Sequence, residues 1–352
     1  MTGVPGISLR PDYRIPRLIR GGWQLSGDHG AVDRARAVDD VVDFVDAGIT
    51  AFDCADIYTG VEEIYGDALR RVADLRGTES AARIRIHTKY VPDRDRLGTL
   101  THEDTRQIIA RSLTRLGREQ LDLVQFHWWD YAVAGMEDTV GHLADLQQEG
   151  LIAHIGITNF GCAQMEAIAG MVDLVSAQVQ FSLLDRRPAT GFAPAARNKS
   201  VHLICYGVLA GGFLTDAWLG QTDPGHYFEN RSLIKYRLVI DEFGGWDAFQ
   251  ALLRVLDAIA SRHDVDIAAV AVRAMLDDPD ASALIIGARY GRHLPRLLRA
   301  TTFSLTNADR AEIATVQSRS PGPVGDVYAL ERDATGPHGR IMKYNLNDAA
   351  PT

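Results

Sequence analysis

The chain has 352 residues, of which 46% are hydrophobic and 24% are charged, a composition typical of a globular protein of one large or two smaller domains. The formal net charge of -9 argues against a nucleic-acid partner and against an anionic membrane surface. No apolar run approaches the ~18 residues of a membrane span, and the N-terminal segment lacks a signal-peptide core, so we expect a cytoplasmic protein.

Strand-like and helix-like patterns alternate along the chain. Eight near-continuous apolar runs, typical of strands buried on both faces, are predicted at 18–20, 49–53, 84–88, 121–126, 152–157, 174–178, 202–206 and 283–286. Helical patterns are predicted at 31–47, 61–71, 102–116, 137–148, 163–169, 192–198, 247–263, 267–276, 294–300 and 306–319.

Eight strand–helix units predict a closed parallel barrel with its active site on the loops that follow the strands. An open, doubly wound sheet usually carries GxGxxG after its first strand, and the sequence GGWQLSG at 21–27 does not match. We therefore predict an α/β protein, a single-domain (β/α)8 TIM barrel over residues 1–319. A long insertion at 213–245 follows the seventh strand, and a turn-rich tail occupies residues 320–352.

Three cysteines, Cys54, Cys162 and Cys205, are an odd number and form no CxxC pair. This usage fits a reduced protein and argues against a zinc site, so we predict no metal.

Polar residues stand at the predicted ends of most strands, where a barrel carries its active site. Along the chain these residues are Asp53 with Tyr58, Lys89, His127, Thr158 with Asn159, Gln178 and Tyr206. Each has an ordinary structural explanation by itself, but their occurrence on one rim indicates a functional site.

The chain resembles the aldo-keto reductase superfamily from about residue 19 to residue 300. The motifs that carry the resemblance are FDCADIY, IHTKY, LDLVQFHW, IGITNF, SAQVQFSLLDR, YGVLAGGFL and IIGAR, in the family's order. The resemblance implies an NAD(P)H-dependent oxidoreductase of the alcohol dehydrogenase type, acting on an aldehyde, ketone or sugar. It also implies a catalytic tetrad of Asp53, Tyr58, Lys89 and His127.

The tetrad has a chemical rationale. A phenol with a pKa of ~10 is a poor proton donor near neutral pH, and a neighbouring Lys89 ammonium favours its phenolate. We expect Tyr58 to act as acid in reduction and as base in oxidation, with Asp53 keeping Lys89 charged. His127 is expected to hydrogen-bond the carbonyl oxygen of the substrate.

The resemblance further implies that Thr158, Asn159 and Gln178 bind the nicotinamide carboxamide and that Tyr206 stacks on its ring. The remaining cofactor contacts expected in this way are Gly22, Trp23, Asp53, Gly207, Val208, Leu209, Gly211, Gly287, Arg289 and Arg292. Relatives often carry Glu-Gln and Asn near the adenine, where this chain has Arg292-His293 and Leu297. Because guanidinium groups pair well with phosphate, we favour NADP(H) over NAD(H).

An aromatic substrate pocket is predicted at the barrel mouth, formed by Trp23, Tyr58, Tyr90, His127, Trp128 and Trp129. The substrate, the physiological direction and the oligomeric state are not specified by the sequence. One alternative is a regulatory subunit that binds the cofactor and turns over little. A metal-dependent barrel lyase or hydrolase is disfavoured, since it needs converging carboxylate or His ligands and Lys89 would compete with the metal.

Overall fold

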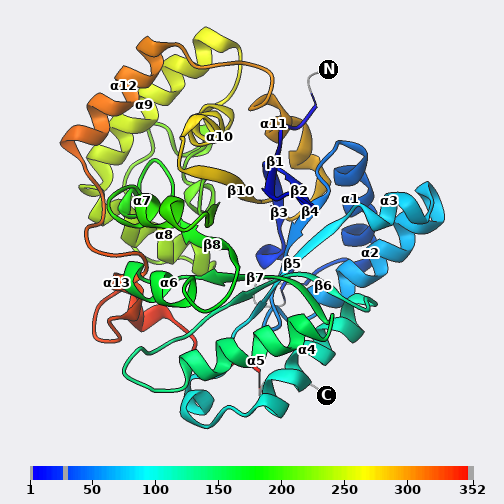
Figure 1. The fold of residues 1–352 in the computed structure, drawn as a ribbon. Helices are drawn as coiled ribbons and strands as arrows, with labels where there is room; N and C mark the ends of the chain where they lie inside the picture. Colours follow the sequence, from blue (N-terminus) through cyan, green and yellow to red (C-terminus); the bar gives the residue numbers. More distant parts are fainter. Residues whose placement is uncertain (1–2, 27–30, 348–352) are drawn as a thin grey trace.

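The computed structural model describes residues 3–26 and 31–347, and in them eight parallel strands close into a barrel surrounded by helices (Figure 1). In barrel order the strands are β3 (Leu18–Gly21), β4 (Ala51–Asp53), β5 (Arg85–Tyr90), β6 (Leu121–Phe126), β7 (Ile152–Thr158), β8 (Leu174–Gln180), β9 (His202–Tyr206) and β10 (Ala281–Gly287). Strand β10 pairs with β3 and closes the barrel. The predicted (β/α)8 TIM barrel is confirmed.

Helices connect successive strands on the outside of the barrel, and further helices extend the chain beyond it (Figure 1). They are α1 (Arg34–Asp46), α2 (Val61–Arg76), α3 (Thr78–Ala82), α4 (His102–Leu116), α5 (Met136–Gln148), α6 (Cys162–Ile168), α7 (Phe192–Asn198), α8 (Arg231–Glu242), α9 (Gly245–His263), α10 (Ile267–Asp277), α11 (Leu294–Arg299), α12 (Asn307–Arg319) and α13 (Ala329–Arg332). None of the helices in the described parts of the chain is long and apolar enough to cross a membrane.

Local sequence fixes where helices start and stop, as α4 illustrates. Its N-cap Thr101 accepts a hydrogen bond from the backbone of Asp104, and the Asp104 side chain binds back to the Thr101 backbone. The helix ends at Gly117, whose φ of 63° is left-handed and therefore suits glycine.

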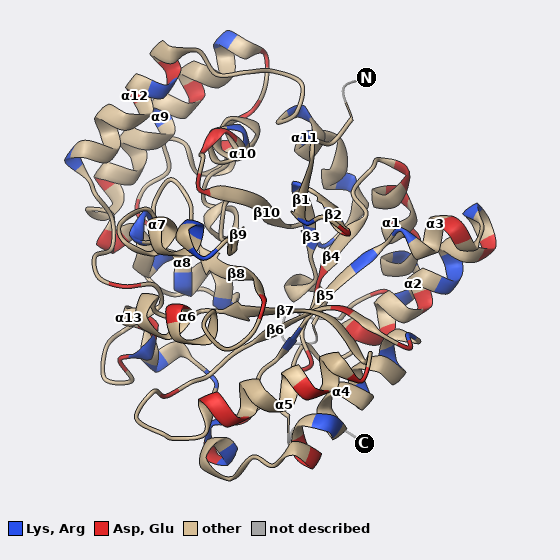
Figure 2. Cartoon of the chain, in the orientation of Figure 1, with Lys and Arg blue, Asp and Glu red and all other residues tan. Residues whose placement is uncertain are grey.

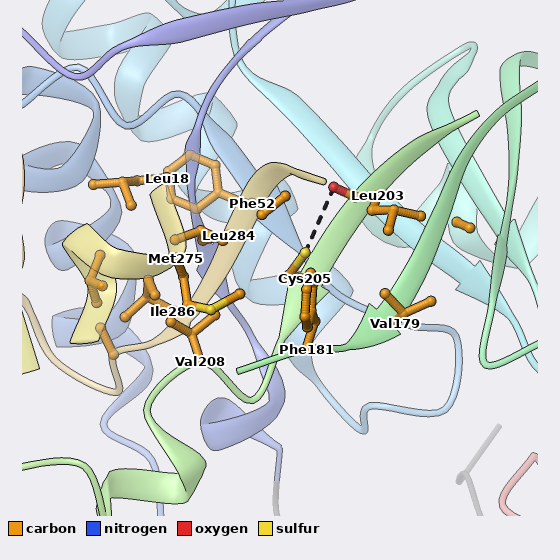
Figure 3. Close-up of a cluster of buried hydrophobic side chains, with 14 of the residues drawn as sticks. Leu18, Phe52, Val179, Phe181, Leu203, Cys205, Val208, Met275, Leu284 and Ile286 are labelled. Atoms are coloured by element: carbon orange, nitrogen blue, oxygen red, sulfur yellow. Dashed lines mark hydrogen bonds between the residues drawn. The ribbon is translucent and has the colours of Figure 1, made fainter. Parts of the chain in front are cut away.

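The main apolar core lies between the outer face of the barrel and the helices. Figure 3 shows one part of it, where Leu284 and Ile286 of β10 meet Met275 of α10 beside Leu18 and Phe52. Side chains alternate along each strand, so these residues face the helices while their neighbours face the barrel interior.

A hairpin that the sequence did not predict fills the N-terminal end of the barrel. Its strands are β1 (Gly6–Arg10) and β2 (Tyr13–Pro16), which pair antiparallel. Tyr13 and Ile15 pack with inward-facing residues such as Ile19 and Leu123. With this end closed by apolar side chains, a ligand can enter from the C-terminal ends of the strands.

The insertion and the tail both contain structure beyond the predicted irregular segments. Helix α8 lies within the insertion, and its N-cap Asn230 accepts a hydrogen bond from the backbone of Ser232. In the tail, α13 is followed by the 3-10 turn η8 (Gly339–Ile341). Both segments contribute side chains to the cavity described next.

Candidate active site

Strand register gathers the polar strand-end residues inside one end of the barrel. Asp53 on β4 lies opposite His87 on β5, so Lys89, two residues further along, projects in the same inward direction. Lys89 in turn lies opposite Gln125 on β6, and His127 follows two residues later. The two-residue period of neighbouring strands therefore places Asp53, Lys89 and His127 around one space.

Lys89 and Asp53 form a buried ion pair. The Lys89 Nζ donates to both Asp53 carboxylate oxygens at 2.8 Å and to the Cys54 carbonyl at 2.7 Å. Each side chain of the pair is only 6% exposed. Burial by itself lowers the pKa of Lys89, but the Asp53 carboxylate outweighs this effect and raises the pKa above its ordinary value. Lys89 is therefore an ammonium at physiological pH.

Tyr58 lies beside this ammonium on the loop between β4 and α2. The Lys89 Nζ is 4.9 Å from the centroid of the Tyr58 ring, and the Trp23 ring is also 4.9 Å from it. Burial raises the pKa of Tyr58, and the positive charge of Lys89 opposes that rise without cancelling it. The expectation that Lys89 brings the Tyr58 pKa below its ordinary value is thus not met, because desolvation of the phenolate is the larger effect.

His127 is neutral and its proton position is defined by geometry. Its Nδ1 lies 2.9 Å from the carbonyl oxygen of Thr158, which can only accept, so Nδ1 carries the proton. Burial, with a further contribution from Arg332, lowers the pKa of His127 to about 3. The buried Nε2 therefore holds a lone pair, and it has no hydrogen-bond partner among the described residues. His127 is set to accept a hydrogen bond, whereas the expected role was to donate one.

The strand ends that follow carry an interlocked set of amides and hydroxyls. Thr158 Oγ1 donates to Gln178 Oε1 at 3.3 Å, and Gln178 Nε2 donates to Asp53 at 2.6 Å. The Tyr206 hydroxyl donates to Asn159 Oδ1 at 2.8 Å, and Asn159 has a left-handed φ of 63°. These bonds fix the directions in which the amides face.

All of these groups line one cavity of about 560 Å³, within the usual range of small-molecule sites. Among the residues proposed from the sequence, those that line it are Trp23, Asp53, Tyr58, Lys89, His127, Trp129, Thr158, Asn159, Gln178, Tyr206, Gly207, Val208, Leu209, Gly211, Gly287 and Arg289. The lining combines proton-carrying groups, amides held by hydrogen bonds and the side chain of Arg289. Together with the His127 Nε2 lone pair, these groups fit a nicotinamide dinucleotide and a small substrate.

Tyr90 and Trp128 were wrongly assigned to the substrate pocket, since neither lines the cavity. Both are fully buried. Each directly follows an inward-facing residue, so the alternation of strand side chains turns it outward. The Tyr90 hydroxyl lies 3.4 Å from Thr105 Oγ1 of α4, and Trp128 Nε1 donates to the Val133 carbonyl at 3.2 Å.

Gly22 also does not line the cavity, and its role is structural. Its backbone N–H donates to the Asp53 carbonyl at 2.7 Å. A Cβ at Gly22 would lie 2.6 Å from that same oxygen, so only glycine allows this approach.

Arg292 is turned away from the cavity as well. Its Nε lies 3.3 Å from His293 Nε2, and its guanidinium is 5.4 Å from the Tyr290 ring centroid. His293 and Arg296 line the cavity instead. Arg292 belongs to the 3-10 turn η7 (Gly291–His293), whereas Arg296 lies on the α-helix α11 that follows it.

The tail supplies cavity residues that sequence reasoning missed. These are Tyr328, Ile341, Met342, Lys343 and Leu346, while Ser232 and Lys235 come from α8. The tail is fastened by Arg332, which donates to the carbonyls of Trp128, Trp129 and Asn159 at 2.7, 2.5 and 2.8 Å. Neither segment has the regular apolar pattern that marks a barrel unit, so no signal in the sequence indicated that they line the cavity.

Comparisons with known proteins agree with this geometry. A family model described as "Aldo/keto reductase family" matches residues 17–318. Aldo-keto reductase YhdN of Bacillus subtilis (strain 168) is 27% identical over 320 residues, covering 89% of this chain and 93% of that protein. The NADH-specific methylglyoxal reductase of Escherichia coli (strain K12) is 25% identical over 317 residues, covering 85% and 93%. The solved glycerol dehydrogenase AKR11B4 from Gluconobacter oxydans shares the fold, with a TM-score of 0.73, 24% identity and coverage of 92% and 96%.

Proposed function

Because the chain belongs to the aldo/keto reductase family, we propose that it transfers a hydride between NADP(H) and a small carbonyl or alcohol substrate, with Tyr58 moving the proton. The chain is a nicotinamide-dependent oxidoreductase of this family. The observation that supports the role of Tyr58 most strongly is the Lys89 ammonium, held by Asp53 and lying 4.9 Å from the Tyr58 ring inside the cavity. A cytoplasmic location and the lack of a nucleic-acid partner stay predictions.

The proposed proton chemistry follows from these three side chains. When bound, a nicotinamide dinucleotide supplies the hydride in reduction and accepts it in oxidation. In reduction the Tyr58 hydroxyl donates its proton to the oxygen that gains negative charge. In oxidation the Tyr58 phenolate takes the hydroxyl proton of the alcohol. Lys89 stabilises the phenolate in both directions, and Asp53 keeps Lys89 charged and in place.

His127 orients the substrate through its Nε2 lone pair. The alcohol proton goes to Tyr58, so the hydrogen bond that His127 accepts must come from a second donor on the substrate. A hydroxyl group next to the reacting carbon meets this requirement. The arrangement therefore favours hydroxy-aldehydes, hydroxy-ketones and sugars over simple carbonyl compounds.

The proposed cofactor contacts divide between the two ends of the cavity. Thr158, Asn159 and Gln178 would hold the carboxamide, and Tyr206 would stack on the nicotinamide. Arg289 lines the far end and supports NADP(H), because a guanidinium binds a phosphate dianion well. Arg296 contributes less, since it is already paired with Asp266 at 2.7 Å and Asp216 at 3.0 Å. Equal catalytic efficiency with NADH and NADPH would refute the preference.

The replacement Tyr58→Phe tests the catalytic role. We expect kcat to fall by about 10²- to 10⁴-fold, the usual contribution of a general acid or base, while NADPH still binds in a fluorescence titration. Tyr90→Phe is the matched control, because Tyr90 is a buried tyrosine that does not line the cavity. Turnover that survives in Tyr58→Phe would contradict the assignment.

A further inference from the structure

Lysine is used sparingly in this chain, and mostly in the cavity. Only four of the 37 basic residues are lysines: Lys89, Lys199, Lys235 and Lys343. Three of them line the cavity, whereas Lys199 is exposed at the end of α7. The other basic residues are arginines, and Figure 2 shows basic and acidic residues interspersed over the outer helices. A lysine ammonium is more compact than a guanidinium and donates in three directions, so the cavity lysines need their own explanation.

The catalytic ion pair accounts for Lys89, but it does not account for Lys235 on α8. The Lys235 Nζ lies 4.9 Å from the Tyr206 ring centroid and 5.8 Å from the Tyr328 ring centroid. Its hydrogen bond to the Tyr206 hydroxyl is long, at 3.5 Å. Within the parts of the chain that the structure describes, Lys235 forms no salt bridge. At least two of its three N–H donors are therefore available to a ligand.

Charged side chains near Lys235 stabilise its ammonium group without accepting its hydrogen bonds. Arg187 bridges the buried carboxylates of Asp185 at 2.7 Å and Glu331 at 3.0 Å, which leaves the three groups with one net negative charge. Burial lowers the pKa of Lys235, and the Glu331 carboxylate opposes that effect. An anion bound directly to the ammonium would raise the pKa again.

The position of Lys235 identifies which part of a ligand it meets. The Tyr328 ring is near both Lys235 and a proposed catalytic group, at 5.8 Å from the Lys235 Nζ and 5.9 Å from the His127 ring. Arg289 lies instead at the end of β10, where the adenosine phosphate is expected. Lys235 thus faces the space near the reacting carbon.

We propose that Lys235 binds a carboxylate group of the substrate, so that among otherwise similar carbonyl and hydroxyl compounds the enzyme prefers those that also carry a carboxylate. This inference rests on the proposed function. A carboxylate accepts several hydrogen bonds from an ammonium, and such charge-assisted bonds are about twice as strong as neutral ones. The phosphates of the dinucleotide share this anionic chemistry, and the experiment below separates the two sources.

The test compares 4-oxobutanoate with butanal, which differ by the carboxylate, in the wild type and in Lys235→Met. We expect the wild type to favour 4-oxobutanoate by about ten- to a hundredfold in kcat/KM, as for a charged hydrogen bond. Lys235→Met should abolish that preference by lowering kcat/KM for 4-oxobutanoate to the value for butanal. Lys199→Met, which removes an exposed lysine outside the cavity, should behave as the wild type.

Three outcomes would overturn the inference: a wild type without the preference, a preference that survives in Lys235→Met, or a raised KM for NADPH with the preference intact. The last outcome would assign the anion to the cofactor. If the wild type reduces neither aldehyde, calorimetry decides the inference separately from the proposed function. Succinate should then bind the wild type, with and without NADP⁺, at least tenfold more tightly than Lys235→Met; equal binding, or none, would refute it.

Discussion

Replacing Lys89 by Met should remove most of the electrostatic support for the Tyr58 phenolate. The Lys89 Nζ lies 4.9 Å from the Tyr58 ring centroid. With an effective dielectric constant of about 20, two unit charges about 5 Å apart interact by ~3 kcal/mol, which corresponds to roughly a hundredfold change in an equilibrium constant. Because alcohol oxidation requires the phenolate, we expect oxidation at neutral pH to slow about a hundredfold.

The pH dependence of alcohol oxidation shows in which direction the Tyr58 pKa moves. Lys89 stabilises the charged form of Tyr58, so its removal raises the Tyr58 pKa and moves the oxidation profile to higher pH. The assay is kcat/KM for alcohol oxidation measured from acidic to alkaline pH. Lys89→Met also leaves Asp53 buried without its cation, which costs about 3–5 kcal/mol of unfolding free energy. The double replacement Asp53→Asn with Lys89→Met removes both charges and serves as the folded comparison.

The reasoning would be refuted by a folded Lys89→Met variant whose oxidation profile stays where the wild-type profile lies. It would also be refuted if the wild type and Lys89→Met oxidised the alcohol at neutral pH with rates within a few-fold of each other. Folding is checked by urea denaturation, which separates loss of the site from loss of the structure.

Three further predictions concern stability and the cofactor. Arg332→Ala should lower the free energy of unfolding by about 1–3 kcal/mol in urea, because three backbone carbonyls lose a charged donor. Burial, with the nearby Glu62 carboxyl, raises the pKa of Asp56 to about 8. The folded protein therefore keeps the Asp56 proton to higher pH than the unfolded chain, in which the pKa of Asp is about 3.9. The free energy of unfolding should fall as the pH rises from about 4 to about 8. Asp56→Asn should make this fall shallower in urea denaturation measured across that pH range. Arg289→Ala should lower kcat/KM about tenfold for NADPH but not for NADH, and equal losses would contradict a phosphate contact.

The barrel could be predicted because parallel strands that are buried on both faces appear in the sequence as near-continuous apolar runs. The predicted strands at 121–126 and 202–206 have the observed bounds of β6 and β9. The N-terminal hairpin has no such apolar run, since its strands are short and mix polar with apolar residues. Helix α8 was missed for a different reason. It follows a long irregular segment, and its Tyr236 packs against Gly207 and Gly211, a contact between distant segments.

The candidate site shows the same division between local pattern and tertiary packing. Motifs at the strand ends indicated Asp53, Lys89 and His127, and the two-residue period of strands then places them inside the barrel. Tyr90 and Trp128 each follow an inward-facing residue and therefore point outward, which is why neither lines the cavity. The proton position of His127 could not be foreseen, because it depends on the distance to a carbonyl oxygen of the neighbouring strand.

The groups proposed to carry out the reaction and those proposed to select the substrate lie on different parts of the fold. The proposed proton-transfer groups and their supporting ion pair are built on barrel strands, or on the short loop after β4, where backbone hydrogen bonds and burial hold them. Lys235 and Tyr328 come from the insertion and the tail, which do not take part in barrel pairing. Changes in these two segments can therefore alter the charge and shape of the cavity mouth while the tetrad stays in place. It follows that exchanging α8 and the tail with those of a relative should transfer substrate preference before it affects hydride transfer.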